Sequence, residues 1–141
     1  MTAATRARLA AYGAVALIVV TIALRVLGFP RTVATIRHAA RRVPARAGAH
    51  AGADTGADTD RVQAVVSGVT AAAILCPART ECLEQSLALY VVLRRSGVPA
   101  ELRFGAIRDP FSAHAWVELH GQPVNEDPEQ LRRYAVFSDA S

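Results

Sequence analysis

Residues 80–99 read TECLEQSLALYVVLRRSGVP and predict one helix from about Glu81 to Ser96. Thr80 is a good N-cap, and an acidic residue in the first turn suits the positive end of the helix dipole. Gly97 fits the position after the last turn, with two arginines before it and a proline beyond it. The interior is apolar almost all round, so we expect this helix to lie at the centre of the fold.

The segments on either side predict one more helix and a small sheet. Residues 61–75 carry apolar residues at near-helical spacing, and Cys76-Pro77 ends that helix because a residue before proline avoids the α region. Downstream, alternating patterns predict three strands at 101–107, 113–119 and 123–126, separated by a loop at 108–112 and a turn at His120-Gly121. Two helices followed by an antiparallel meander predict an α+β layer.

Composition and charge exclude some classes of protein. The 141 residues suffice for one domain, and 29 alanines leave a small aliphatic core within the 52% of apolar residues. All 16 basic residues are arginine. Residues 1–46 hold eight of them and no acid, whereas residues 61–141 hold eight arginines and nine acids. The compact part therefore lacks the basic patch that nucleic-acid binding requires.

The chain divides into three pieces by composition: an apolar, arginine-rich N-terminal helical arm at 1–46, a linker at 47–60, and a compact domain at 61–141. The linker contains Ala, Gly, Asp and Thr but no large apolar residue, so it cannot offset the entropy of ordering. Residues 9–24 are uncharged, but a helix of that length spans about 24 Å, short of the bilayer core of about 30 Å. A helix extended to Phe29 would be long enough to span the bilayer core. Three interpretations stay open: a membrane anchor, a signal peptide, and a helix that belongs to the fold or docks on a partner. The small residues and Arg25 favour the third, because they lower the hydrophobicity of the segment.

Cys82 is the candidate nucleophile. It stands near the first turn of the central helix, where backbone N–H groups are unpaired; such a position lowers the pKa of a thiol and can bind an oxyanion. The alternative is a small buried thiol with no chemical role. We expect Cys76 and Cys82 to stay reduced in a cytosolic compartment, because one pair of cysteines is too few for a disulfide-stapled secreted scaffold.

His114 is the candidate general base, since a cysteine and a distant histidine are the minimum for thiol catalysis. The alternative is a surface histidine at a strand entry. A carboxylate would orient the imidazole. A two-residue hairpin loop sets His114 opposite Asp127, and a three-residue loop sets it opposite Glu126; Asn125 is a weaker candidate. The alternative for this acidic stretch is a solvated turn.

A zinc site would have suitable residue types in Cys76, Cys82, His114 and His120. The two histidines, however, would lie about 20 Å apart along a strand, and the cysteine spacing is wider than usual. We therefore expect no metal and no cofactor.

Several segments together resemble one protein family. They are TECLEQSLAL (80–89), LRRSGVPA (93–100), FG (104–105), FSAHAWVE (111–118) and GQPVNE (121–126). In this order they resemble the lasso peptide biosynthesis leader peptidases, small bacterial proteins with a transglutaminase-like, papain-related fold. The resemblance covers about residues 61–137.

The resemblance implies a cysteine peptidase that removes the leader from a ribosomally made precursor, before a separate ATP-using cyclase closes the ring. It implies Cys82 as nucleophile and His114 as general base. The acid falls at Glu126, where Asp is more usual, so the third role is shared between Glu126 and Asp127. Residues 1–60 are too few and too simple in composition for a leader-binding domain, so we expect a separate recognition protein. Two other functions stay open: a non-catalytic scaffold held at a membrane through residues 9–29, and an acyl transferase or amidase using the same thioester chemistry.

Overall fold

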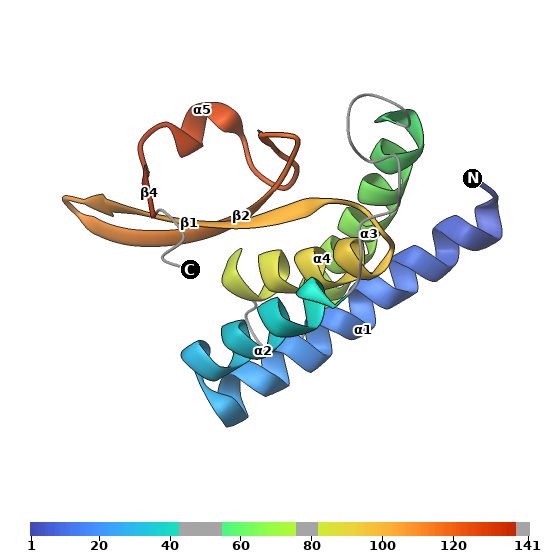
Figure 1. The fold of residues 1–141 in the computed structure, drawn as a ribbon, viewed down its shortest axis with the longest axis horizontal. Helices are drawn as coiled ribbons and strands as arrows, with labels where there is room; N and C mark the ends of the chain where they lie inside the picture. The colour runs from blue at the N-terminus through green and yellow to red at the C-terminus, as the bar shows by residue number, and fades with distance from the viewer. Residues whose placement is uncertain (43–54, 76–81, 138–141) are drawn as a thin grey trace.

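The computed structural model describes residues 1–42, 55–75 and 82–137. Expectations for Cys76, Thr80, Glu81 and residues 47–54 of the linker lie outside these residues. In chain order the elements are α1 (Ala3–Leu27), α2 (Phe29–Arg41), α3 (Thr55–Leu75), α4 (Cys82–Arg95), β1 (Ala100–Arg108), β2 (Phe111–Leu119), β3 (Gln122–Pro123), α5 (Pro128–Leu131) and β4 (Ala135–Val136). Figure 1 shows α1, α2 and α4 on one side of the sheet and α5 on the other, with α3 rising past one end of the sheet. The predicted α+β fold, with a central helix packed on a small antiparallel sheet, is confirmed.

Helix α4 lies at the centre and ends as its sequence predicts. Gly97 has φ of 81°, a conformation that favours glycine. Its N–H donates to the carbonyl of Arg94, and the N–H of Val98 donates to the carbonyl of Leu93. This pair of bonds is a Schellman motif, which satisfies carbonyls that the end of a helix leaves unpaired. Val98 is buried beyond it and directs the chain into β1.

The sheet has the order β3-β2-β1-β4, and its neighbouring strands are antiparallel. Strand β2 begins at Phe111, two residues earlier than predicted, so only Asp109-Pro110 separates it from β1. The expected loop at 108–112 is therefore wrong: pairing of Arg108 with Phe111 and of Ile107 with Ser112 extends the hairpin almost to its tip. At the other hairpin Leu119 pairs with Gln122, as the two-residue loop predicts.

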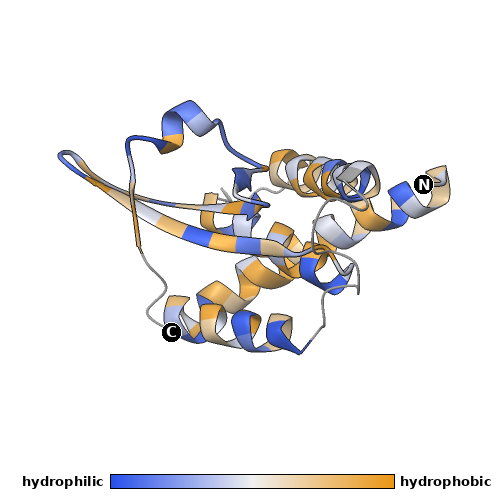
Figure 2. Cartoon of the chain, turned by 45° about the horizontal axis from the view of Figure 1, so that its top comes forward, coloured by the Kyte–Doolittle hydropathy of each residue, from blue (hydrophilic) through white to orange (hydrophobic). Residues whose placement is uncertain are grey.

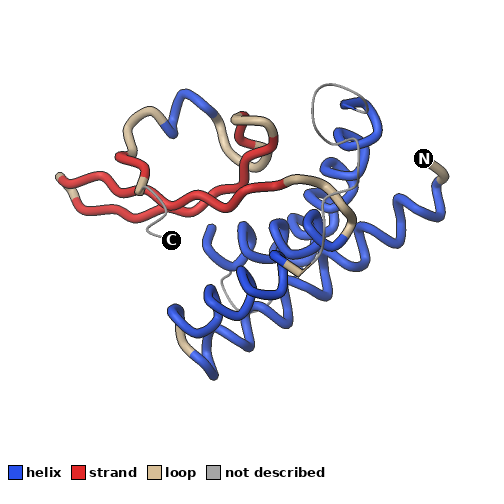
Figure 3. Tube along the Cα trace, in the orientation of Figure 1, coloured by secondary structure: helices blue, strands red, loops and turns tan. Residues whose placement is uncertain are grey.

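The third strand is shorter than predicted. Residues 123–126 were expected to continue the meander, but β3 ends at Pro123. One more backbone bond follows, from Val124 N–H to the Val117 carbonyl, and then the side chain of Asn125 takes the Val117 N–H. Because a side chain replaces the backbone at that point, the chain is released from the edge of β2. Figure 3 shows it crossing the outer face of the sheet through α5 to β4 on the opposite edge.

Helix α1 packs against α3 at very close range. A Cβ atom on Gly68 would lie 1.9 Å from the Ala10 carbonyl oxygen, and one on Gly13 would lie 2.8 Å from the Val65 oxygen. One face of α1 joins the hydrophobic core, with Leu17 fully buried. Helix α1 extends beyond the predicted residues 9–24 at both ends. Its length and composition would allow it to cross a membrane, but core helices of soluble proteins meet the same criteria.

Two further helical boundaries differ from the sequence prediction. Helix α3 begins at Thr55 rather than Arg61, so residues 55–60 are helical although their composition predicted a linker. Asp58 lies in the first turn, where the helix dipole favours an acid, and it pairs with Arg61 at 3.1 Å. Helix α2 was not predicted as a separate element; Gly28, with φ of 79°, separates it from α1. Figure 2 shows hydrophobic residues concentrated in the helical layer and a largely hydrophilic segment around α5.

Candidate active site

Cys82 is the first residue of α4 and is half-buried. It borders a cavity of about 220 Å³ between α3, α4 and the segment after β3, where Asn125 and Glu126 complete the lining. The first turn of a helix has backbone N–H groups without intrahelical partners. A carbonyl group entering this cavity from solvent would meet both the thiol and the N-terminal end of α4.

Glu126 connects this cavity to the predicted base. Its Oε1 lies 2.8 Å from Nε2 of His114, and both side chains are largely withdrawn from solvent, at 24% and 17% exposure. A carboxylate on Nε2 holds the proton there, so Nδ1 is the nitrogen left to accept a proton from a thiol. The geometry thus joins His114 to Glu126 directly, and Glu126 to the cavity of Cys82.

Asp127 has a different position. Its side chain accepts the Glu129 N–H at 3.0 Å and caps α5. The two-residue hairpin predicted Asp127 opposite His114, and the hairpin has that loop; but strand alternation no longer applies after β3 ends. The acidic stretch does not continue the strand: Glu126 is half-buried against His114, whereas Asp127, Pro128 and Glu129 are exposed, as the solvated-turn alternative predicts. His120, the other histidine of this hairpin, lies at its tip with φ of 51°.

A buried polar network ties together the segments that carry these residues. Ser86 is fully buried one turn after Cys82 and donates its hydroxyl to the Ala115 carbonyl at 2.8 Å. The side-chain amide of Asn125 donates to the Ser86 oxygen at 3.0 Å, and its carbonyl accepts the Val117 N–H at 2.9 Å. Buried groups of this kind are costly to leave unpaired, so the network fixes α4, β2 and the segment after β3 relative to one another.

Aromatic rings fix the position of the imidazole. His114 stacks with Tyr134 at 5.4 Å between centroids and with Trp116 at 6.3 Å. Trp116 is fully buried and covers Gly105, where a Cβ atom would lie 2.9 Å from the indole ring. A side chain at that position would therefore displace the indole. Tyr134 follows α5, so the segment that crosses the sheet also covers the histidine.

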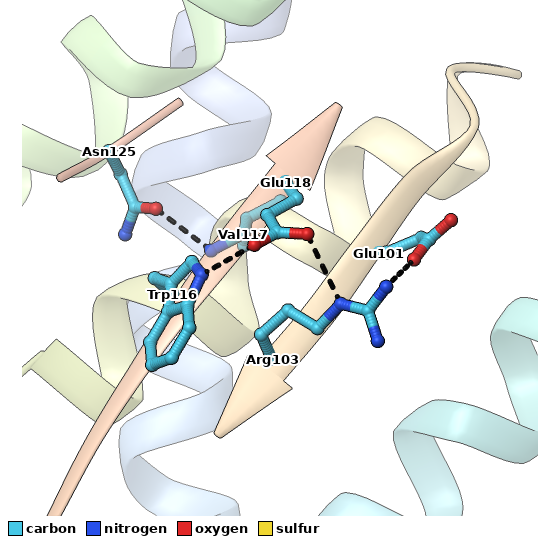
Figure 4. A network of polar contacts seen from close by, with 6 residues as sticks. All are labelled: Glu101, Arg103, Trp116, Val117, Glu118 and Asn125. Carbon is cyan, nitrogen blue, oxygen red and sulfur yellow. Dashed lines mark hydrogen bonds and ion pairs between the residues drawn. The ribbon is translucent and has the colours of Figure 1, made fainter. Parts of the chain in front are cut away.

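The indole is held in turn by charged groups, as Figure 4 shows. Trp116 Nε1 donates to Glu118 at 3.0 Å, and Glu118 also accepts from Arg103 Nε at 3.2 Å. The guanidinium of Arg103 also donates to the Glu101 carboxylate at 2.6 Å. Residues 101, 103, 116 and 118 share one face of β1 and β2, because directly paired residues point to the same side.

Comparison with known proteins gives the family. The transglutaminase-like superfamily matches residues 14–139, which is most of the chain. This protein belongs to the transglutaminase-like superfamily. The match includes most of α1, so the N-terminal helix is part of the family's domain as well as of the packed core.

A relative of this transglutaminase-like protein is the microcin J25-processing protein McjB of Escherichia coli, with 33% identity over 61 residues. The aligned stretch is 43% of this chain and 29% of McjB, so the chain matches less than a third of that relative. No solved structure matches. The resemblance found in the sequence is confirmed at the level of the family.

The sequence reasoning missed two features of this transglutaminase-like site. Ser86 was not singled out, although a serine one turn after a cysteine, at the start of the apolar part of the helix, is a usable signal. Asn125 was rated a weak orienting group, whereas its amide bonds two elements of the site. Among the residues described, no three His, Cys, Asp or Glu side chains gather as metal ligands would.

Proposed function

We propose that this protein is a cysteine peptidase that removes the leader from a ribosomally made lasso peptide precursor. The observation that carries the proposal is the position of Glu126, which contacts His114 at 2.8 Å and lines the same cavity as Cys82. A carboxylate that orients a histidine, together with a thiol at a helix start, supplies the parts of a nucleophilic triad.

The chemistry proceeds through a thioester. His114 accepts the thiol proton, and the Cys82 sulfur attacks the scissile carbonyl carbon, whose oxyanion is stabilised by N–H groups of the first turn of α4. The C–N bond breaks, and the imidazolium gives its proton to the departing amine of the core peptide. Water, deprotonated by the same imidazole, hydrolyses the thioester, which releases the leader as a carboxylic acid and regenerates the thiol.

The substrate class rests on the relative. McjB is described as a processing protein for microcin J25, and the similarity supports a peptide precursor of the same type for this chain. The amine released by cleavage would then be the group that a lasso cyclase consumes when it closes the ring. We propose a cytoplasmic location, where thiols stay reduced, with α1 as the candidate membrane contact.

We further propose that a separate recognition protein delivers the leader. The cavity beside Cys82 has room for a few side chains, not for a leader peptide. Residues 1–42 are engaged in the helical layer rather than in a domain of their own. Binding by a second protein would raise the local concentration of the scissile bond.

The test is cleavage of full-length precursor by purified protein, with and without the recognition protein, followed by mass spectrometry. We expect slow cleavage alone and a strong increase with the partner. Cys82→Ala abolishes cleavage, while Cys76→Ala is nearly silent. Equal loss in the two cysteine variants, or efficient cleavage that the partner does not change, contradicts the proposal.

Histidine variants provide the matched pair for the base. We expect His114→Ala to lower turnover by about a hundredfold or more, the usual scale for a general base, and His120→Ala to cost little. Incorporation of one oxygen atom from labelled water into the leader identifies hydrolysis. A product joined to an added amine would instead identify the acyl transferase, and maturation that proceeds normally with Cys82→Ala would identify a scaffold.

A further inference from the structure

Helix α1 exposes an apolar stripe along its outer face. Its six large side chains are between 52% and 75% exposed and recur at three- and four-residue intervals: Tyr12, Val15, Ile18, Val19, Ile22 and Val26. Residues at these spacings lie on one side of a helix. Soluble monomers rarely expose a contiguous apolar surface of this kind unless something covers it.

The opposite face of α1 is fixed to the protein. Leu17 and Val20 are buried in the core, and Gly68 of α3 lies against the backbone at Ala10 so closely that no side-chain atom would fit. An α1 that crossed a bilayer would have to leave this packing and uncover α3 and α4. What covers the stripe must therefore approach it from outside.

The charge around the stripe indicates the chemistry of that partner. Residues 1–42 contain seven arginines and no acid, while the remaining residues contain nine arginines against twelve acids. Arg8 lies at one end of the stripe and donates to the Tyr12 hydroxyl at 3.5 Å, and Arg25 lies near the other end. A second copy of the same face would bring like charges together, which disfavours a dimer through α1.

We propose that α1 docks the protein on an anionic lipid surface, with the helix axis parallel to the membrane plane and the stripe among the acyl chains. An apolar face with arginines at its ends suits the boundary between acyl chains and acidic headgroups. The stripe is mainly Val and Ile, whereas the centres of protein interfaces are enriched in aromatic residues and methionine. In Figure 1 α1 lies on the side of the helical layer away from the sheet, so docking leaves the segment around α5 clear of the surface.

The experiment measures sedimentation of the full chain with vesicles of phosphatidylcholine alone and with about 30% phosphatidylglycerol. One variant carries Val15→Gln, Val19→Gln and Ile22→Gln. A matched control carries three changes at apolar residues off the stripe that are more exposed still, Ile74→Gln, Leu75→Gln and Phe111→Gln. Thermal unfolding of both variants verifies the fold, since all the replaced side chains are exposed.

We expect the wild type and the control to bind the anionic vesicles, and the stripe variant to bind about tenfold or more weakly. Binding should also fall on raising the salt to about 0.5 M, because lipid headgroup charges are then screened. Stripe-variant binding equal to wild type, equal binding to neutral vesicles, or no vesicle binding at all overturns the proposal. Stripe-dependent self-association or binding to a protein partner in place of vesicle binding would overturn it too. No cleavage is measured, so the result is independent of the proposed peptidase function.

Discussion

Glu126 and Asp127 are adjacent acids with different partners. Substituting each acid alone therefore distinguishes orientation of the imidazole from capping of α5. Glu126 contacts His114, and Asp127 caps α5. We expect Glu126→Gln to lower kcat on the order of a hundredfold, because an amide neither orients the imidazole by charge nor stabilises the imidazolium. Asp127→Asn should keep near-normal kcat, since Asn is also a good cap. Steady-state kinetics on both variants decides the question, and a larger loss for Asp127→Asn would assign the third role to Asp127.

The Ser86–Asn125 network gives a second prediction at this scale. Ser86→Ala removes the hydroxyl between Ala115 and Asn125, so it should lower the free energy of unfolding by about 1–3 kcal/mol and lower kcat more than it raises KM. Asn125→Ala should do the same, and the double variant should cost less than the sum because the two side chains share one network. Denaturant unfolding and kinetics measure both effects.

Ser67→Ala is the control for the network. The Ser67 hydroxyl is exposed and donates to the Gln63 carbonyl of its own helix, so little change is expected. Additive losses for Ser86→Ala and Asn125→Ala would show that the two side chains act independently, contrary to the geometry.

At the scale of elements, the crossing of α1 and α3 depends on a glycine. A Cβ at Gly68 would lie 1.9 Å from the Ala10 oxygen, and backbone cannot move aside as a flexible side chain can. We expect Gly68→Ala to destabilise the protein by about 1–3 kcal/mol or more, through forced separation of the helices. Gly56, on the same helix, has nothing within 4 Å of its Cβ position, so Gly56→Ala should be neutral or stabilise by up to about 1 kcal/mol. Thermal unfolding of the pair gives the comparison, and similar melting temperatures would contradict the close crossing.

Elements with strong local signals could be predicted from the sequence. Helix α4 has its stop signal at Gly97, and alternating polar and apolar residues mark parts of β1 and β2, so these elements could be predicted from neighbouring residues. Elements that depend on distant contacts could not. Residues 55–60 look like a linker because their helix is supported by packing further along α3, and β3 ends early because the Asn125 side chain takes the bond of a distant strand.

The residues of the candidate site likewise divide into those that the sequence could predict and those that it could not. Cys82 and His114 could be named from residue type and position, since both stand near predicted element boundaries. The choice between Glu126 and Asp127 could not be made, because it depends on where the chain leaves the sheet. Likewise α1 is apolar on two faces, and periodicity cannot tell a face that packs on α3 from one that faces outward.

At the scale of the whole molecule, the helical layer links the N-terminal segment to the stability of the domain. The composition of the chain predicted a domain at 61–141 that is separate from the arm at 1–46. In the structure Leu9, Leu17 and Val20 of α1 share one core with residues of α3 and α4. Each such side chain contributes about 1.5–3 kcal/mol by burial, and together they approach the whole stability of a typical domain, about 5–15 kcal/mol.

We therefore expect a fragment of residues 61–141 to lack a cooperative unfolding transition, because removal of α1 and α2 uncovers Val65 and Leu93, which are fully buried in the intact chain. Adding residues 1–42 as a separate chain should restore the transition, since the close crossing at Gly68 needs only the surface of α1 and not its connection to α3. Circular dichroism and calorimetry of the fragment, with and without the added segment, measure this. A fragment that melts cooperatively near the temperature of the full chain would show that 61–141 folds alone and that α1 is an appendage.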